Sequence, residues 1–304
     1  MNTQSVLLES NLPLPYFSRG KVRDTYDLGN RLLIVTTDRI SAFDVVLPCG
    51  IHDKGAVLNR LSAFWFQRTE SIIANHLIEV VGDARCLDNY LPAASRFAYP
   101  SYLEERSMIV KKAKLIPVEC VVRGYLSGSA WAEYQKQGTV NGEPLPEGLK
   151  ESQELPELLF TPTTKAETGH DQPLSTDELK KMVGGTMAHE LKEKSLAIYN
   201  YTREYARARD IIIADTKMEF GLDGDRLIII DELLTPDSSR FWDALLYKVG
   251  QSQPSYDKQP VRDWLAGSGW NKEPPAPILP ADVIEATTRK YRHAYERLTG
   301  KKLG

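Results

Sequence analysis

The stretch that most constrains the fold is a pair of apolar runs separated by a short turn. Residues 211–214 read IIIA, residues 227–230 read LIII, and Asp223-Gly224-Asp225 lies between them. An Asp-Gly turn between two apolar runs is typical of a β-hairpin. The sequence therefore predicts two antiparallel strands that are joined near Gly224.

The first of these strands carries charged residues at alternate positions. Because successive side chains in a strand point to opposite faces, Asp215, Lys217 and Glu219 are expected on one face. The second strand ends in Asp231-Glu232, which brings further carboxylates close. From the hairpin alone, two interpretations stay open: a solvated face with a lysine–carboxylate pair, or a site for Mg²⁺ and phosphate.

Length and composition limit the class of protein. A chain of 304 residues can form one large core or two domains. A net charge of −3 argues against nonspecific nucleic-acid binding, and no apolar run approaches the roughly 20 residues of a membrane helix. The N-terminus does not resemble a signal peptide, and three widely spaced cysteines fit reduced thiols. We expect a cytoplasmic protein without a nucleic-acid or membrane partner.

Three segments outside the hairpin are candidates for ligand contacts. A Gly20-Lys21 turn before the apolar strand 32–35 either covers phosphates or belongs to an ordinary hairpin. The polar segment 38–44 is predicted to be a loop, either at the mouth of a cleft or paired internally. The strand 118–123 runs into a Gly/Ser turn and a helix at 130–137. That turn predicts an anion site at a helix N-terminus or a simple capped loop.

The remaining helices follow from apolar spacing. A helix is predicted around Leu58 to Ile73, and a capping box opens another at Ser175. A longer helix over 186–209 is expected to bury Met187, Leu191, Ile198, Tyr201 and Tyr205. Residues 138–174 are predicted to be irregular, a short helix is expected at 263–270, and a final helix at 283–298.

Six segments together resemble a known family. They are GKVRD at 20–24, DRISAFD at 38–44, VECVVRGYLSGSAW at 118–131, FTPTTKAE at 160–167, IIADTKMEFG at 212–221 and DELLTPDSSRFW at 231–242. In this order they resemble the SAICAR synthetase (phosphoribosylaminoimidazole-succinocarboxamide synthase) family over nearly the whole chain. The segments 138–174 and beyond 242 resemble the longer, stand-alone form of that family.

The resemblance implies an ATP-dependent ligase of purine biosynthesis. Such an enzyme joins the carboxylate of carboxyaminoimidazole ribotide (CAIR) to the amine of L-aspartate, giving SAICAR, ADP and phosphate. A carboxylate is a poor acyl donor until one of its oxygens becomes a phosphate leaving group. Mg²⁺ and basic side chains must therefore neutralise the crowded anions. The implied cofactors are ATP and Mg²⁺, the implied partners are small molecules only, and a monomer is favoured over a homo-oligomer.

The resemblance also implies roles for individual residues. Glu219 and Asp231 match magnesium ligands, and Asp215 and Lys217 match catalytic residues around the CAIR base and the reacting centre. The implied ATP contacts are Gly20, Lys21, Val22, Arg23, Val110, Leu115 and Glu119. The implied contacts to CAIR and aspartate are Asp38, Arg39, Ser41, Arg123, Ser129 and Arg240.

The implied fold is α+β in two parts, with an ATP cleft between them. A smaller antiparallel β domain would comprise 1–114, a larger α/β domain 115–304, and the boundary would fall in a connector at 111–117. The main alternative is a kinase, since a Gly-rich loop, a lysine and metal carboxylates also serve phosphoryl transfer. A protein kinase is disfavoured because HRD-x₄-N and DFG motifs are missing from the sequence. A catalytically inactive nucleotide-binding protein is disfavoured because the charged positions are occupied.

Overall fold

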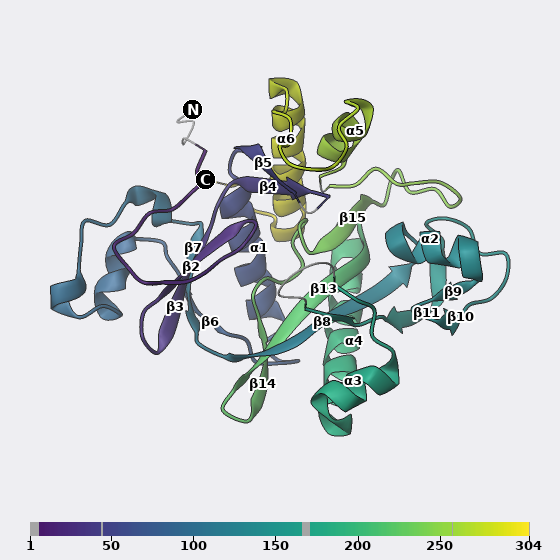
Figure 1. The fold of residues 1–304 in the computed structure, drawn as a ribbon, viewed down its shortest axis with the longest axis horizontal. Coiled ribbons are helices and arrows are strands. Elements are labelled where there is room, and N and C mark those ends of the chain that lie inside the picture. Colours follow the sequence, from purple (N-terminus) through teal and green to yellow (C-terminus); the bar gives the residue numbers. More distant parts are fainter. Residues whose placement is uncertain (1–5, 44, 166–170, 257, 304) are drawn as a thin grey trace. The chain divides into compact units, whose positions relative to one another are not determined.

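A computed structural model of the protein describes residues 6–43, 45–165, 171–256 and 258–303 (Figure 1). The chain divides into two compact units. Unit 1 contains residues 1–67, 76–112 and 257–304, and unit 2 contains residues 68–75 and 113–256. The predicted domains 1–114 and 115–304 differ from these units mainly at the C-terminal segment, which groups here with the first unit.

Unit 1 is built on a five-stranded antiparallel sheet. Its strand order is β1–β2–β3–β7–β6, and the strands are β1 (Tyr16–Arg19), β2 (Arg23–Asp27), β3 (Arg31–Thr36), β7 (Ser107–Lys111) and β6 (Leu77–Val80). Alternate apolar residues of β2, β3 and β7, among them Tyr26, Leu33 and Ile109, are fully buried in one core. Short 3₁₀ turns at 84–89, 93–95 and 101–103 cover the connection from β6 to β7.

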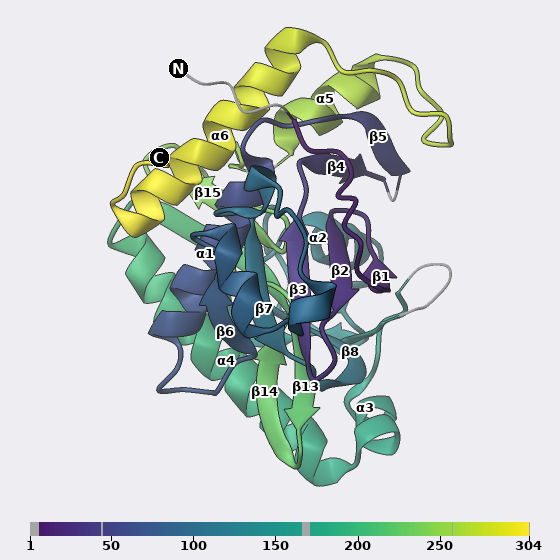
Figure 2. The same ribbon diagram turned by 90° about the vertical axis from the view of Figure 1, so that its left-hand side faces the viewer.

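A second core of unit 1 forms where the sequence predicted a loop. Residues 38–44 contribute the strand β4 (Arg39–Ala42), which pairs with β5 (Val45–Gly50), so the prediction of an irregular segment was wrong. Alternation explains the difference, since Ile40 and Ala42 share one face and belong to the same core as Val261 and Leu265 of α5 (Gln259–Gly267). Figure 2 shows β4 and β5 beside α5. The remaining helices of the unit are α1 (Lys54–Arg68) and α6 (Ala281–Thr299).

Unit 2 is built on the predicted hairpin. The sheet has the order β11–β8–β13–β14, with β15 on the other part of β13 and β12 on β8. Its strands are β11 (Glu154–Phe160), β8 (Lys114–Tyr125), β13 (Ile211–Asp223), β14 (Arg226–Ile230), β15 (Ser239–Asp243) and β12 (Thr163–Thr164). The register from Glu219 opposite Ile230 to Asp223 opposite Arg226 confirms the hairpin.

Two predictions about this unit were wrong. The segment 138–174 is not irregular, because it contains β9 (Thr139–Val140), β10 (Glu143–Pro144), β11 and β12. The connector at 111–117 ends earlier than predicted, because β8 already begins at Lys114. The cause of the second error is Pro117, which normally argues against a central strand.

The pairing of β8 with β13 explains how a proline is accommodated. Glu119 lies opposite Glu219, and Leu115 lies opposite Gly221. Four residues along β8 therefore correspond to two residues along β13. Pro117 lies inside this irregular segment. A bulge of this kind interrupts the ladder, and the missing N–H of a proline then costs little.

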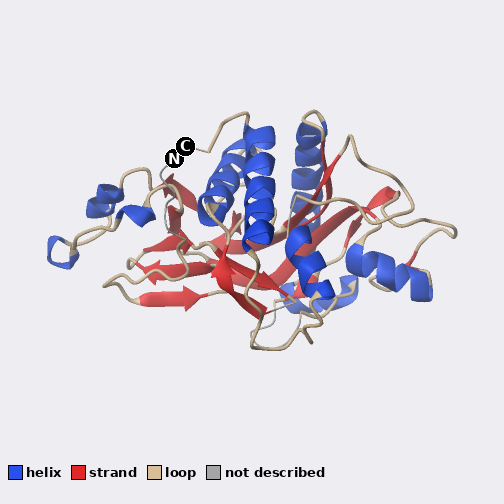
Figure 3. Cartoon of the chain, turned by 90° about the horizontal axis from the view of Figure 1, so that it is seen from above, coloured by secondary structure: helices blue, strands red, loops and turns tan. Residues whose placement is uncertain are grey.

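Three helices complete unit 2. They are α2 (Gly128–Gln137), α3 (Thr176–Val183) and α4 (Gly185–Arg207), and the capping box at Ser175 is present as predicted. Figure 3 distinguishes the helices of the chain, in blue, from its strands, in red. The buried face of α4 consists of Ala188, Leu191, Ser195, Ile198, Tyr199, Thr202 and Ala206. Tyr201, predicted to point inward, is 38% exposed, and its neighbour Tyr199 is fully buried instead.

Antiparallel sheets with separate helices make this an α+β fold, as the sequence predicted. No helix in the described ranges is long and apolar enough to cross a membrane.

Candidate active site

Asp215 is the centre of a charged cluster in unit 2. It lies opposite Arg123 of β8 on one side and opposite Arg240 of β15 on the other. Arg123 Nη1 is 3.3 Å from Asp215 Oδ2, and Arg240 donates a hydrogen bond to the same oxygen. The Asp215 side chain is only 8% exposed, so these contacts are poorly screened by water.

A β-bulge between Ile213 and Asp215 determines which face of the sheet Asp215 occupies. Ile213 lies opposite Phe241, and Thr216 lies opposite Ser239. Three residues along β13 therefore correspond to two residues along β15. Residues two apart on β15 share a face, and the Thr216 and Ser239 hydroxyls are indeed 2.8 Å apart. Ile213 and Thr216 therefore share one face, and the bulge turns Asp215 to the opposite one.

Lys217 and Glu219 follow on the same face as Asp215. Lys217 forms an ion pair with Glu119 of β8, and its Nζ is 3.9 Å from Glu219 Oε1. Burial disfavours the charged form of Lys217, but the carboxylates of Glu119 and Glu219 outweigh it and raise its pKa. Lys217 is therefore an ammonium ion that cannot act as a base near neutral pH.

Glu219 is a buried carboxylate with neighbours of both signs. Its side chain is 7% exposed and forms an ion pair with Lys165. Burial, followed by the negative charge of Asp231, raises the pKa of Glu219 above its ordinary value. Asp231 follows the last residue of β14 with a left-handed backbone, at φ 66°.

The pair Glu219 and Asp231 fits a hard divalent cation. Glu219 is buried and Asp231 is half-buried. Two carboxylates that repel each other are stabilised when such a cation lies between them, and Mg²⁺ needs only one or two carboxylates beside phosphate oxygens and water. Within the described ranges, no group of three or more His, Cys, Asp or Glu residues is arranged to hold a metal by itself. The residues fit an ion that arrives with a phosphate ligand.

The N-terminus of α2 lies beside the two arginines. Arg123 Nη2 is 3.4 Å from the hydroxyl of Ser129 in the first turn of the helix. Gly128 has a positive φ of 59°, and a Cβ at this position would overlap the Arg240 guanidinium. The Ser127 hydroxyl at the N-cap is buried and finds no hydrogen-bond partner among the residues that the structure describes.

These features favour an anion at this position. Two guanidinium groups share one carboxylate, which leaves the three side chains of Arg123, Arg240 and Asp215 with a net positive charge. Backbone N–H groups at a helix N-terminus add a positive partial charge. An unsatisfied buried hydroxyl such as that of Ser127 gains a hydrogen bond when an anion binds.

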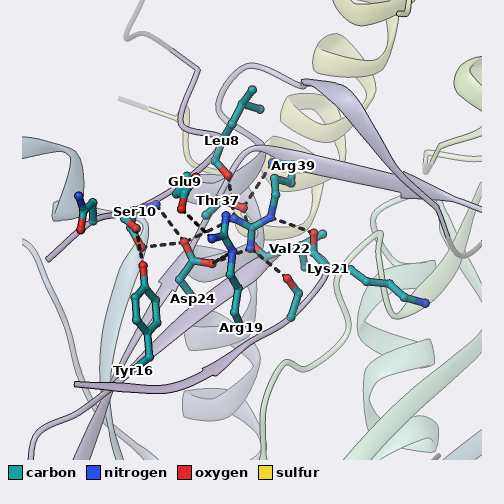
Figure 4. A network of polar contacts seen from close by, with 12 residues as sticks. Leu8, Glu9, Ser10, Tyr16, Arg19, Lys21, Val22, Asp24, Thr37 and Arg39 are labelled. Atoms are coloured by element: carbon teal, nitrogen blue, oxygen red, sulfur yellow. Dashed lines mark hydrogen bonds and ion pairs between the residues drawn. The ribbon is translucent and has the colours of Figure 1, made fainter. Parts of the chain in front are cut away.

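In unit 1, Arg39 fixes the backbone of the Gly20 segment (Figure 4). It donates hydrogen bonds to the carbonyl oxygens of Leu8 (2.7 Å), Gly20 (3.0 Å) and Lys21 (3.1 Å). It also forms a 2.7 Å ion pair with Asp24, whose side chain is fully buried. Burial would raise the pKa of Asp24, but its hydrogen bonds, the largest from Arg39, lower it overall.

The Arg39 network changes the interpretation of the 38–44 segment. Arg39 was predicted to contact a substrate, but its guanidinium is occupied by the protein itself, which is the internally paired alternative. Asp38 is similar, because it is 1% exposed and accepts hydrogen bonds from Arg106 Nη1 and from backbone N–H groups of Leu7 and Gly55. Ser41 is half-buried in β4.

Lys21 differs from Arg39 in its surroundings. Its side chain is exposed and extends away from the Arg39 network (Figure 4). Thr37 bonds the carbonyl oxygen of Val22 through its hydroxyl at 2.8 Å and its N–H at 2.9 Å. Three successive carbonyl oxygens, from Gly20 to Val22, are thus bound to Arg39 or Thr37. A phosphate near this segment would not meet those carbonyl oxygens, which would repel it.

The other predicted ATP contacts lie in both units. Val22, Arg23 and Val110 belong to unit 1, where Val110 is fully buried in β7, and Leu115 and Glu119 belong to β8 of unit 2. Three residues of the predicted segments, Asp44, Ala166 and Glu167, lie outside the described residues.

Sequence analysis missed two residues of this site. Lys165 pairs with Glu219, although only the unusual composition of the segment 160–167 drew attention to it. Ser127 was part of a predicted anion-binding turn, but its missing hydrogen bond is visible only in three dimensions.

Together, the fold and the charged residues define a class of protein. The α+β fold combines a helix N-terminus beside two arginines with a lysine between carboxylates and a carboxylate pair. These are the features of an enzyme that binds phosphorylated, anionic substrates.

Comparison with known proteins identifies the family. The sequence profile of the SAICAR synthetase family matches residues 16–277, and the chain belongs to this family. It is 52% identical to the phosphoribosylaminoimidazole-succinocarboxamide synthase of Thermodesulfovibrio yellowstonii, over 97% of this chain and 99% of that protein. The corresponding synthase of Geobacter metallireducens is also 52% identical, over 98% and 99%.

A solved structure supports the same assignment. The SAICAR synthase from Saccharomyces cerevisiae, solved in complex with SAICAR, superimposes with a TM-score of 0.89 at 46% identity, covering 98% of this chain and 99% of that one. At this identity the similarity extends to sequence as well as fold.

Proposed function

We propose that this protein is an ATP-dependent ligase of purine biosynthesis, which joins the carboxylate of CAIR to the amine of L-aspartate and releases SAICAR, ADP and phosphate. The observation that carries the proposal is the position of Asp215 between Arg123 and Arg240, on the same sheet face as Lys217 and Glu219. The substrates proposed for this arrangement are inferred from membership of the SAICAR synthetase family.

The two arginines and the N-terminus of α2 are proposed to bind the ribose 5′-phosphate of CAIR. A planar guanidinium can bind a phosphate through two parallel hydrogen bonds, and Ser127 and Ser129 offer hydroxyl donors beside it. Asp215 holds both guanidinium groups in orientation before the substrate arrives. On this account, the aminoimidazole ring of CAIR lies further along β13, toward Lys217.

Lys217 is proposed to stabilise the negative charge that develops at the reacting carboxylate. Its raised pKa keeps it an ammonium ion, and its two carboxylate neighbours fix the position of Nζ. A charge that is already oriented in a poorly solvated place stabilises a transition state more than a mobile one does. The chain thus binds and orients the anions.

Glu219 and Asp231 are proposed to hold Mg²⁺ that arrives with ATP. When bound, the ion would neutralise phosphate charge and favour transfer of the γ-phosphate. Glu219 would bind the ion in its ionised form, although burial and the charge of Asp231 raise its pKa in the metal-free protein. Lys165 then serves as the counter-charge of Glu219 in the metal-free protein.

The Gly20 segment is proposed to bind ATP phosphates through Lys21, and Val22, Arg23, Val110, Leu115 and Glu119 to complete the nucleotide site. Arg39 and Thr37 support the segment from the other side of the backbone. Asp38 and Arg39 are therefore proposed to act on structure rather than on the substrate directly, and Ser41 is proposed to contact the substrate. The enzyme is further proposed to act in the cytoplasm as a monomer.

A kinase is the competing function, and L-aspartate distinguishes the two. Purified protein is incubated with ATP, Mg²⁺ and CAIR, and ADP is measured with and without L-aspartate. The ligase requires aspartate for sustained ADP release. Equal and sustained release without aspartate would support a kinase or another phosphotransferase.

A further inference from the structure

Tyr199 of α4 is bonded to the β-bulge that orients Asp215. Its side chain is fully buried, and its hydroxyl donates to the carbonyl oxygen of Ile213 at 2.5 Å. The carbonyl oxygen of Ala214 is also within 3.3 Å of the same hydroxyl. These are the two carbonyl groups immediately before Asp215, within the bulge itself.

The neighbouring strand leaves room for this hydroxyl. Gly124 follows Arg123 on β8, and a Cβ at Gly124 would overlap the Tyr199 hydroxyl and lie 3.0 Å from its Cζ. Any other residue at Gly124 would therefore displace the tyrosine or the strand. Three elements, α4, β8 and β13, thus meet at one hydroxyl beside the opposed pair Arg123 and Asp215.

We propose that Tyr199 is a positioning residue for Asp215, and that Gly124 is required for its action. The proposal rests on the proposed function, in which Asp215 orients the arginines that bind CAIR. Tyr199 itself touches no substrate on this account. It acts through the backbone of Ile213 and Ala214.

The physical argument concerns the two possible courses of β13. With the bulge, Asp215 lies on the face opposite Ile213, whereas regular alternation from Ile213 would place Asp215, and with it Lys217 and Glu219, on the face of Ile213. A bulge interrupts the ladder, so its carbonyl groups need donors from elsewhere. The Tyr199 hydroxyl is such a donor. Burial raises its pKa, so it stays protonated over the working pH range.

The first test replaces the hydroxyl alone. Tyr199→Phe is compared with Tyr247→Phe, a matched control in which the lost hydroxyl donates to the carbonyl oxygen of Ser152 at 2.7 Å in the same unit. For Tyr199→Phe, we expect kcat/KM for CAIR to fall by about tenfold to a hundredfold, because a displacement near 1 Å can cost that much. KM for ATP should change less than about twofold, and Tyr247→Phe should leave all kinetic constants unchanged.

The second test uses Gly124. Gly124→Ala should lower kcat/KM for CAIR in the wild-type background, because the new methyl group displaces the hydroxyl. In the Tyr199→Phe background the worst overlap is gone, so the same substitution should have a much smaller effect. Equal effects of Gly124→Ala in both backgrounds would contradict the proposed connection between the two residues.

Hydrogen exchange tests the proposal independently of turnover. Amide exchange at 213–216 should accelerate in Tyr199→Phe and stay unchanged in Tyr247→Phe. Unchanged exchange there would overturn the proposal whatever the kinetics. Accelerated exchange with unchanged constants for CAIR would overturn it too, since the tyrosine would then be only structural. A wild-type protein that forms no SAICAR would instead contradict the proposed function, and exchange would still decide whether Tyr199 fixes the bulge.

Discussion

Arg240 of β15 lies directly opposite Asp215 of β13 and donates a hydrogen bond to its carboxylate. Because Arg123 contacts the same oxygen from the other side, the carboxylate orients two guanidinium groups at once. A phosphate that replaces water here meets donors that need little reorganisation.

Arg240→Lys is therefore expected to be a severe change despite its conserved charge. An ammonium ion cannot form two parallel hydrogen bonds to a phosphate, so KM for CAIR should rise by about tenfold, or roughly 1.4 kcal/mol. KM for ATP should change little. Steady-state kinetics with each substrate varied in turn measures the effect.

A control for this prediction is Arg207→Lys in the same unit. Arg207 is 64% exposed and its nearest carboxylate, Glu154, is 3.5 Å away, so its replacement should leave all constants unchanged. If Arg240→Lys changed KM for ATP alone, the assignment of Arg240 to the CAIR site would be wrong. Equal effects on all three substrates would reduce its role to holding β15 in place.

Glu219→Gln and Asp231→Asn are each expected to abolish turnover while the fold persists. Each variant removes one of two hard oxygen ligands, which should cost on the order of several kcal/mol of transition-state stabilisation. Turnover is measured over a range of Mg²⁺ concentrations, and thermal unfolding is followed in parallel. Asp225→Asn, in the exposed hairpin turn, is the control and should leave turnover unchanged. Near-normal kcat in either variant at ordinary Mg²⁺ would refute the metal assignment.

Lys21→Ala is expected to weaken the use of ATP and to spare the affinity for CAIR. The exposed ammonium group is proposed to meet the phosphates, and its removal leaves the backbone contacts of Arg39 intact. Isothermal titration of the two ligands separates the effects. If ATP affinity and turnover were both unchanged, Lys21 would belong to an ordinary solvated hairpin.

Arg39→Lys is expected to affect both stability and ATP. Lysine keeps the charge beside Asp24 but cannot reproduce the hydrogen bonds to Leu8, Gly20 and Lys21, so unfolding should become easier by about 1–3 kcal/mol. KM for ATP should rise more than KM for CAIR, because the Gly20 segment loses its support.

The control for Arg39→Lys is Arg106→Lys. Arg106 is also a buried arginine of unit 1, and its ion pair, 2.8 Å long, is with Asp38. Arg106→Lys should lower the free energy of unfolding to a similar extent without a selective effect on KM for ATP. Indistinguishable kinetics for the two variants would mean that Arg39 has no special connection to the nucleotide.

The hairpin of β13 and β14 could be predicted from the sequence because its signals are local. Apolar runs and an Asp-Gly turn specify the strands, and alternation specifies that Lys217 and Glu219 share a face. Alternation also predicts that Asp215 shares this face, whereas the bulge that places Ile213 on the opposite face is not evident from the sequence. An uninterrupted count from Ile213 would have given Ile213 and Asp215 the same face.

Other features depend on partners far away in the sequence. The family resemblance implied a substrate contact for Arg39, and the segment alone left internal pairing open. In the structure, Arg39 donates to four acceptors from Leu8, Gly20, Lys21 and Asp24. Pro117 suggested a connector, but it lies at an irregularity of β8 that only the pairing with β13 creates. The sequence predicted that Tyr201 is buried, but Tyr199 is the buried tyrosine of α4. Which of two tyrosines so close in a helix is buried depends on packing against the rest of the fold.

The measurement that tests the central claim most directly follows the nitrogen of aspartate. Purified protein is incubated with ATP, Mg²⁺, CAIR and ¹⁵N-labelled L-aspartate, and the products are analysed by mass spectrometry together with ADP. The proposed ligase should give a product with the mass of SAICAR that carries the label in its new amide, with one ADP for each product molecule. ADP without a labelled amide product would contradict the assignment of this protein as the ligase.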